Sequence, residues 1–215
     1  MKKILTLVAA LMVAKCAMGQ PYVLSSNLTV NAVIPDNDPS GVASTMTVGG
    51  MTAAIANVTV TLDITGGYNG DLYAYVTYDG QLLTLLNRVG QGTGSDPTYT
   101  FGYSDAGLDV TLADGASNGN IHNYQSAGGY GGLIGSGGTF TPDSTGGATF
   151  AGTYGGLDGN GTWSLFLADL SAGNQSTLAS WSLDITTVPE PTALAIGALG
   201  VLVLAGVRKK IALGK

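Results

Sequence analysis

The chain of 215 residues is poor in cysteine and in histidine. Its one cysteine, Cys16, lies close to the N-terminus, so the body of the protein can form no internal disulfide. Its one histidine, His122, lies in a glycine-rich stretch. A serine or cysteine hydrolase needs a nucleophile, a base within reach and an acid that orients the base. The sequence therefore predicts a surface-loop role for His122 and a chain that is not an enzyme.

Charge is also scarce, since charged residues make up 10% of the chain. Between Gln20 and Val188 the single basic residue is Arg88, against thirteen aspartates and no glutamate. Such an acidic body repels phosphates, which excludes nucleic acid as a partner, whereas carboxylates suit divalent cations. The other basic residues all lie at the two ends: Lys2, Lys3, Lys15, Arg208, Lys209, Lys210 and Lys215.

The chain is rich in glycine, with 34 residues, and no internal stretch keeps an apolar period of 3.6 residues, so helix content should be low. Alternation with a period of two predicts strands instead. Asp79-Gly80 is typical of a two-residue hairpin turn. Several short strands separated by turns indicate an all-β, jelly-roll-type β-sandwich. The predicted strands are Ser44–Val48, Ile55–Ile64, Asp71–Tyr78, Leu82–Leu86 and Leu108–Leu112.

The stretch Gly161–Ile185 should contain the heaviest part of the core. Trp163 and Leu165 share one strand face, and Trp181 and Leu183 share the face of a second strand. A polar loop separates the two strands, which we therefore expect to form a hairpin.

Four other segments are less regular. Gln20–Val30 is either a lead-in or a first edge strand, and Asp114–Gly138, which has no clear period, is expected to be a long surface excursion. Thr139–Pro142 and Thr149–Thr153 should lead back to the Trp163 hairpin.

Met1–Gly19 has the features of a signal peptide. Two lysines precede an apolar run, and small residues precede a cleavage point between Gly19 and Gln20. The prediction is an N-terminal signal helix and export from the cytoplasm.

The C-terminal end contains a sixteen-residue uncharged run, Thr192–Val207, followed at once by Arg208-Lys209-Lys210. As a helix this run would span roughly 24 Å, somewhat less than a hydrocarbon core of about 30 Å. The motif Val188-Pro189-Glu190-Pro191 precedes it. Together these features resemble the PEP-CTERM sorting signal. The resemblance implies a Gram-negative bacterium that makes exopolysaccharide, and processing of the tail in the membrane by an exosortase.

The body resembles the P domain, or homo B domain, that follows the catalytic domain of kexin- and furin-like proteases. This resemblance implies a galactose-binding-like β-sandwich and an association with serine proteolysis, although the catalytic domain is missing. Ile64, Asn174 and Ser176 depart from the pattern of that family. The matching segments are Ile34-Pro35-Asp36-Asn37, Val58–Ile64 running to Gly70-Asp71-Leu72, Tyr78-Asp79-Gly80, Gly161-Thr162-Trp163-Ser164-Leu165 with Asp169, and Leu178 with Ser180-Trp181-Ser182-Leu183.

Calcium is the one cofactor that the sequence suggests. Asp36, Asp38 and Ser40 imitate the opening of a D-x-D-x-S-G calcium loop, although the bidentate acid of an EF-hand would fall at Thr47. An Asx turn explains the same residues without a metal. Asp71 and Asp169 could cap loops at one end of the sandwich or add carboxylates there. Tyr73, Tyr75 and Tyr78 could stack on a carbohydrate or could simply pack.

The predicted organisation is a signal peptide (1–19), a lead-in (20–30), a P-domain-like sandwich (31–187) and a PEP-CTERM segment (188–211). The leading hypothesis is an exported, non-enzymatic protein of the cell surface or extracellular matrix that passes through an inner-membrane intermediate. Two alternatives are an accessory module to a subtilisin-like envelope protease and a calcium-dependent carbohydrate-binding module. The predicted partners are an exosortase-type enzyme and either exopolysaccharide or an envelope protease.

Overall fold

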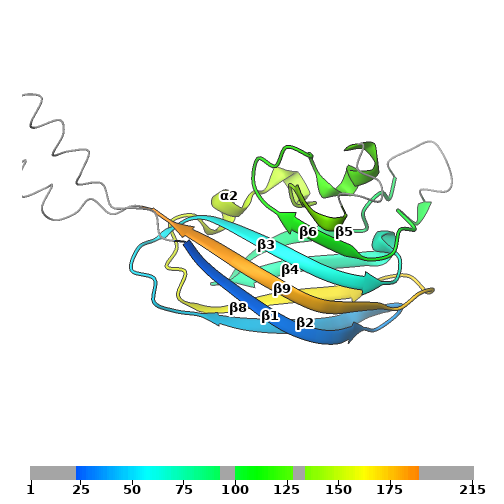
Figure 1. The fold of residues 1–215 in the computed structure, drawn as a ribbon, viewed down its shortest axis with the longest axis horizontal. Helices are drawn as coiled ribbons and strands as arrows, with labels where there is room; N and C mark the ends of the chain where they lie inside the picture. Colours follow the sequence, from blue (N-terminus) through cyan, green and yellow to red (C-terminus); the bar gives the residue numbers. More distant parts are fainter. Residues whose placement is uncertain (1–22, 93–99, 128–133, 189–215) are drawn as a thin grey trace, which may run out of the picture. The chain divides into compact units, whose positions relative to one another are not determined.

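Two β-sheets packed face to face make up the body of the protein (Figure 1). The computed structural model describes residues 23–92, 100–127 and 134–188, and nine strands lie in these ranges. One sheet has the order β1-β9-β3-β6-β7, and the other has the order β2-β8-β4-β5. The strands are β1 (Val23–Ile34), β2 (Asp38–Val48), β3 (Ile55–Gly66), β4 (Leu72–Tyr78), β5 (Gln81–Asn87), β6 (Leu108–Leu112), β7 (Gly135–Phe140), β8 (Gly161–Asp169) and β9 (Ser176–Thr187). The predicted all-β sandwich is confirmed.

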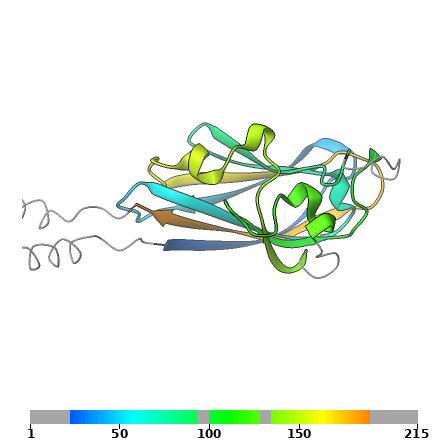
Figure 2. The same ribbon diagram turned by 90° about the horizontal axis from the view of Figure 1, so that it is seen from above.

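The core lies between the two layers that Figure 2 shows from above. Alternate residues of each central strand are buried, which is the period of two that a strand with one buried face requires. Trp181 of β9 donates its indole Nε1–H to Ser44 Oγ of β2 over 3.0 Å, and this bond joins one sheet to the other. Trp163 of β8 stacks on Tyr78 of β4, with ring centroids 4.1 Å apart. Both predicted tryptophan anchors are therefore core residues, as are Leu165 and Leu183.

The predicted pairing of the two tryptophan strands is wrong. β8 pairs with β2 and β4, whereas β9 pairs with β1 and β3 in the other sheet. The loop between them crosses from one layer to the other, so the segment is an arch and not a hairpin. By contrast, β4 and β5 form the hairpin that Asp79-Gly80 predicts, with Tyr78 opposite Gln81 and positive φ at both turn residues.

The N-terminal part of the described chain is an edge strand. β1 pairs with β9 from Val23 opposite Thr186 to Ile34 opposite Ser176. Of the two alternatives for Gln20–Val30, the structure shows the edge strand for residues 23–30.

The predicted surface excursion over Asp114–Gly138 is also wrong for the residues that the structure describes. A 3-10 segment, η3 (Ile121–Ala127), buries Ile121 and Tyr124 completely, and β7 adds a parallel strand beside β6. Side chains without a period can still be buried when single residues of an irregular segment fill the end of a core.

A short helix, α2 (Phe150–Tyr154), lies in the segment Thr149–Thr153 that was expected to lead back toward Trp163. Thr149 caps it, because its Oγ1 accepts from the Gly152 N–H over 3.1 Å. The carboxylate of Asp114 accepts from the N–H groups of Phe150 and Ala151, both over 2.8 Å. An acid from a distant loop therefore satisfies the first N–H groups of the helix.

Among residues 23–92, 100–127 and 134–188, no helix is both long enough and apolar enough to span a bilayer. The predicted signal helix, the cleavage point at Gly19 and Gln20, and the apolar run 192–207 lie outside these ranges.

Candidate functional site

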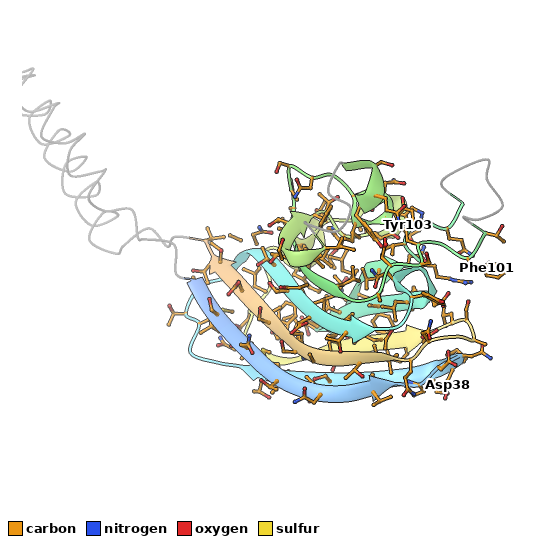
Figure 3. All side chains as sticks on the ribbon, turned by 45° about the vertical axis from the view of Figure 1, so that its right-hand side comes forward. Asp38, Phe101 and Tyr103 are labelled. Carbon is orange, nitrogen blue, oxygen red and sulfur yellow. The ribbon has the colours of Figure 1, made fainter. Side chains whose placement is uncertain are left out.

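A cleft of about 650 Å³ lies at one end of the sandwich. Four connections meet there: the β1–β2 turn, the segment between β3 and β4, the segment before β6, and the β8–β9 loop. Figure 3 shows Phe101, Tyr103 and Asp38 at this end, whereas β1 begins and β9 ends at the other. Residues that line the cleft include Asn37, Tyr68, Asp71, Phe101, Tyr103, Ser104 and Ser171.

Close backbone packing positions the wall that carries Phe101 and Tyr103. The Gly70 N–H donates to Tyr103 O over 2.8 Å, and the Tyr103 N–H donates to Val89 O over 3.0 Å. A Cβ on Gly102 would lie 2.5 Å from Val89 O, and one on Gly70 would lie 2.5 Å from Tyr103 N. Only glycine allows these two backbones to approach so closely.

Aromatic rings form the rim of the cleft. Phe101 is 66% exposed and Tyr68 is 37% exposed, while Tyr103 is buried behind them against Tyr124. These are two of the few large hydrophobic side chains that the described residues expose, and both lie at the same cleft. An exposed aromatic pair at a concave surface is typical of a binding site rather than of chance exposure.

One carboxylate, that of Asp71, lines the cleft, and a guanidinium lies beside it. Asp71 belongs to a short 3-10 turn, η1 (Asn69–Asp71), and its side chain is 5% exposed. Arg88 Nη2 lies 3.9 Å from Asp71 Oδ1 and donates to Ser171 Oγ over 2.6 Å. Burial raises the pKa of Asp71, while hydrogen bonding with Ser171 and the charge of Arg88 oppose the rise.

A second carboxylate, Asp169, lies at the end of β8 and is fully buried. Its Oδ1 accepts from the Ser171 N–H over 3.2 Å. No hydrogen-bond partner among the described residues reaches its buried Oδ2. Burial raises the pKa of Asp169, the hydrogen bond from the Ser171 N–H opposes the rise, and the charges of Asp71 and Asp36 add to it. Asp36, Asp38, Asp71 and Asp169 thus share this end of the sandwich with the single basic side chain of the described body, Arg88.

Asp169→Asn is expected to stabilise the folded protein by about 1 kcal/mol at neutral pH, because a neutral amide replaces a buried carboxylate that is repelled by its neighbours. In the folded protein the pKa of Asp169 is raised above its ordinary value of 3.8. The protonated carboxyl therefore favours the folded state fully below pH 3.8, and this contribution to stability is lost as pH rises through the raised pKa. The advantage of the variant should therefore shrink as pH falls toward 3.8. Thermal melts at a series of pH values measure it.

The matched control for this variant is Asp184→Asn, which changes a partly exposed carboxylate on β9. It should leave the melting temperature almost unchanged across the series. A loss of stability in Asp169→Asn at every pH would contradict the buried-carboxylate interpretation.

The structure separates the side chains of the predicted calcium loop. Asp38 Oδ1 accepts from the Ser40 N–H over 2.8 Å, which is the Asx turn that the sequence left open as the alternative. The Asp36 carboxylate accepts from the Gly173 N–H, at 3.0 and 3.3 Å from its two oxygens. In the described part of the chain, no group of three or more acidic, histidine or cysteine side chains is placed to hold a metal ion. Calcium at Asp36, Asp38 and Ser40 stays a prediction.

His122 lies in η3 as half of a pair with Asp143. Its Nδ1 is 2.6 Å from Asp143 Oδ2, as in a general base oriented by an acid. Its Nε2, however, is 3.0 Å from the main-chain oxygen of Gln91. Both ring nitrogens are therefore engaged, and the pair holds the Gln91 segment against η3.

Of the predicted sugar-stacking tyrosines, Tyr78 is buried against Trp163. Tyr73 and Tyr75 lie on the outer face of β4, where Tyr75 stacks on Phe166 with centroids 4.8 Å apart. The sequence did not predict the cleft aromatics Tyr68 and Phe101. Both lie in connections between strands, where no alternation of apolar and polar residues shows which side chains are exposed. The one available signal was a large aromatic within a glycine-rich stretch.

Comparison with family models finds the PEP-CTERM protein-sorting motif at residues 187–210. The predicted sorting motif is confirmed, and it implies an exported protein processed by an exosortase-type membrane enzyme in a Gram-negative bacterium. Of its predicted residues, the structure describes Val188, which is exposed, while Pro189, Glu190, Pro191, Arg208, Lys209 and Lys210 lie outside the described ranges. A comparison with curated proteins found no match.

Comparison with solved structures finds a serine protease of Aeromonas sobria. In the complex of that protease with its chaperone, the match has 16% identity, a TM-score of 0.48, and covers 84% of this chain and 29% of the other. In the protease alone, it has 14% identity, a TM-score of 0.44, and covers 78% of this chain and 27% of the other. This chain thus spans less than a third of the length of either protein.

Proposed function

We propose that the chain is a non-enzymatic binding or structural protein of the cell surface or extracellular matrix. The sorting motif begins at residue 187, where β9 ends, and this observation carries the proposal. Every described strand lies before it, and residues 23–187 form one compact unit. Removal of the tail by an exosortase would therefore release a sandwich with all its strand pairs intact.

The position of the two ends of this unit supports the same proposal. Val23 lies opposite Thr186 at one end of the sandwich, and the cleft lies at the other end, beyond Ile34 and Ser176. The tail is therefore attached at the end of the sandwich opposite the cleft.

The non-enzymatic part of the proposal rests on His122. In the described residues it is the only histidine, and its Nε2 lies against a main-chain carbonyl oxygen instead of a nucleophile. A ring nitrogen that donates its N–H to a carbonyl oxygen has no free lone pair with which to accept a proton from a serine or cysteine.

Mass spectrometry of the protein recovered from cells and from the medium tests the proposal. The exported form should begin at Gln20 and end near Pro189. An exported form that keeps Lys215 would contradict exosortase processing, and recovery from the cytoplasm alone would contradict export. Stoichiometric co-purification with a subtilisin-like protease would favour the accessory role instead.

Pro189→Ala is expected to slow removal of the tail, because it alters the motif directly before the apolar run. The full-length chain, with Lys215 present, should then accumulate in the membrane fraction, while the released form in the medium falls by about tenfold or more. Pro39→Ala, an exposed proline of β2, is the control and should be processed normally. Equal processing of both variants would show that the motif is not what the enzyme reads.

A further inference from the structure

We propose that two copies of this chain associate edge to edge through β1, with residues 23–29 of the two copies paired antiparallel about a twofold axis at Ser26. The inference goes beyond the proposed function, since it names a second copy of the chain as a partner and does not depend on what the cleft binds. β1 is the outermost strand of the five-stranded sheet (Figure 1). Its one strand partner in the described ranges is β9.

The free edge of β1 is unprotected over these residues. Within the described parts of the chain, no backbone hydrogen bond outside the β1–β9 ladder involves residues 23–34. Such an edge offers a row of N–H and C=O groups to another strand, and proteins commonly guard it with charged side chains, prolines or bulges. β1 contains no charged residue and no proline. Its bulge lies between Thr29 and Ala32, which leaves residues 23–29 regular and able to pair.

The core-facing side chains of β1 still have apolar surface to bury. Leu24, Ser26 and Leu28 lie opposite buried residues of β9, so they are on the core side of the sheet. The two leucines are only partly buried against the core. A strand placed alongside β1 would cover more of both leucines, and removing this apolar surface from water favours the association.

The stretch is complementary to itself in antiparallel pairing. When Ser26 lies opposite Ser26 of the second copy, each Leu24 lies opposite a Leu28, and each Ser25 lies opposite an Asn27. The leucine pairs are on the core side, and the pairs of Ser25 with Asn27 are on the outer side, where Ser25 and Asn27 are exposed. Apolar groups therefore meet apolar groups, polar groups meet polar groups, and no like charges meet. A twofold axis closes such an interface at two copies.

Two of the other edge strands are covered by segments of the same chain. The Asp143 N–H donates to Leu85 O of β5 over 3.0 Å. The side-chain amide of Asn118 donates to Thr139 O of β7 over 2.9 Å. Acceptor groups of these two edges are therefore already occupied, which makes them poor sites for a second copy.

β2 is the fourth edge strand, and it has less to gain from pairing. It contains Pro39 and a bulge near its start. Its core-facing residues Ser44, Met46 and Val48 are already buried, in contrast to the leucines of β1. Among the described edges, β1 therefore suits a second copy best.

Disulfide cross-linking of the exported protein tests both the pairing and its register. This form lacks Cys16, which precedes the predicted cleavage point, so an introduced cysteine is its only thiol. Directly opposite residues of an antiparallel pair have Cα atoms about 4.5–5.5 Å apart, which is within the reach of a disulfide. Ser26→Cys should therefore form a covalent dimer on mild oxidation with diamide.

The matched controls for this variant are Ser25→Cys and Asn27→Cys. Each of them alone places its two thiols on a diagonal of the pair, about 7–8 Å apart, and should lose the cross-link. An equal mixture of the two variants brings unlike cysteines directly opposite each other, and it should form the cross-linked heterodimer.

Light scattering after size-exclusion chromatography measures the association of the protein without cysteines. Because one pair of short strands is a small contact, the concentration series extends to about 1 mM. The mass should rise with concentration to that of a dimer. Ser26→Lys places two ammonium groups opposite each other at the twofold axis and should weaken the association by about tenfold or more.

The control for the lysine variant is Thr59→Lys, which adds the same charge to the outer face of β3, two strands in from the edge. It should associate as the parent does. Thermal melts show whether both lysine variants are folded, and the cysteine series does not depend on that result.

Several outcomes would overturn the proposal. These are an exported protein that stays monomeric up to about 1 mM, assemblies of more than two copies, cross-linking of Ser25→Cys alone as fast as that of Ser26→Cys, or a folded Ser26→Lys that associates as the parent does. Cross-linking of Ser26→Cys to a different protein would assign the edge to another partner instead. A protein that is exported and processed as proposed yet stays monomeric would refute this inference alone.

Discussion

Trp163→Ala should lower the free energy of unfolding by about 3–5 kcal/mol, the largest effect that we expect from one substitution. The indole is fully buried, stacks on Tyr78 and packs edge-on against Tyr154, with centroids 5.0 Å apart. Its Nε1–H donates to Gly159 O over 3.2 Å. The truncation therefore leaves a cavity between two rings and a buried carbonyl with one partner fewer. Urea denaturation measures the loss, which should appear in thermal melts as a fall of roughly 10 °C.

Phe166→Ala is the matched control for this prediction, because Phe166 lies on the same strand but points to the outer face. It is half-buried and stacks on Tyr75. Its truncation should cost no more than about 1.5 kcal/mol, since the site remains open to water. An equal loss of stability in Trp163→Ala and Phe166→Ala would contradict this prediction. It would mean that burial of the Trp163 indole in the core adds no more stability than the partly exposed Phe166 ring.

Gly102→Ala should destabilise the protein by about 3 kcal/mol. Gly102 has a φ of +83°, and its new Cβ would lie 2.5 Å from Val89 O and 2.7 Å from Gly70 Cα. Both neighbours are main-chain atoms, so neither can rotate away. The wall that carries Phe101 must therefore move outward. Thermal melts measure the loss of stability.

Gly119→Ala measures the cost of a left-handed backbone conformation alone, without a steric clash of the new Cβ. Gly119 has a similar φ of +77°, but nothing lies within 4 Å of its added Cβ. Only the left-handed backbone should cost energy there, about 1–2 kcal/mol, and the cleft should be unaffected. Equal losses in both glycine variants would mean that the contact between Gly70 and Gly102 does not hold the cleft wall.

The strands could be predicted because each central strand alternates buried and outward residues. Val58, Val60, Leu62 and Ile64 of β3 follow this rule, and all four are buried. The pairing of β8 with β2 and β4, instead of with β9, could not be predicted. A period of two shows that a face is buried but carries no information about the strand alongside or the sheet to which it belongs.

The irregular segments were harder to predict. Ile121 and Tyr124 belong to the core, but no periodic apolar pattern in the sequence predicts their burial. The 3-10 segment that carries them has seven residues, which is too short to show such a pattern. His122 was expected at a surface loop, and the structure pairs it with Asp143, a residue 21 positions further along the chain. Such a contact depends on how β7 returns the chain toward η3.

The amino-acid sequence by itself determined the strand positions, the acidic body and the sorting motif at residues 187–210, because each is a local property of neighbouring residues. Only the tertiary structure decided that the two tryptophan strands lie in different sheets and that Tyr68, Asp71, Phe101 and Ser171 line one cleft. These four residues come from three connections far apart in the chain. Their meeting depends on which strands pair, and long-range pairing is set by the packing of the whole core.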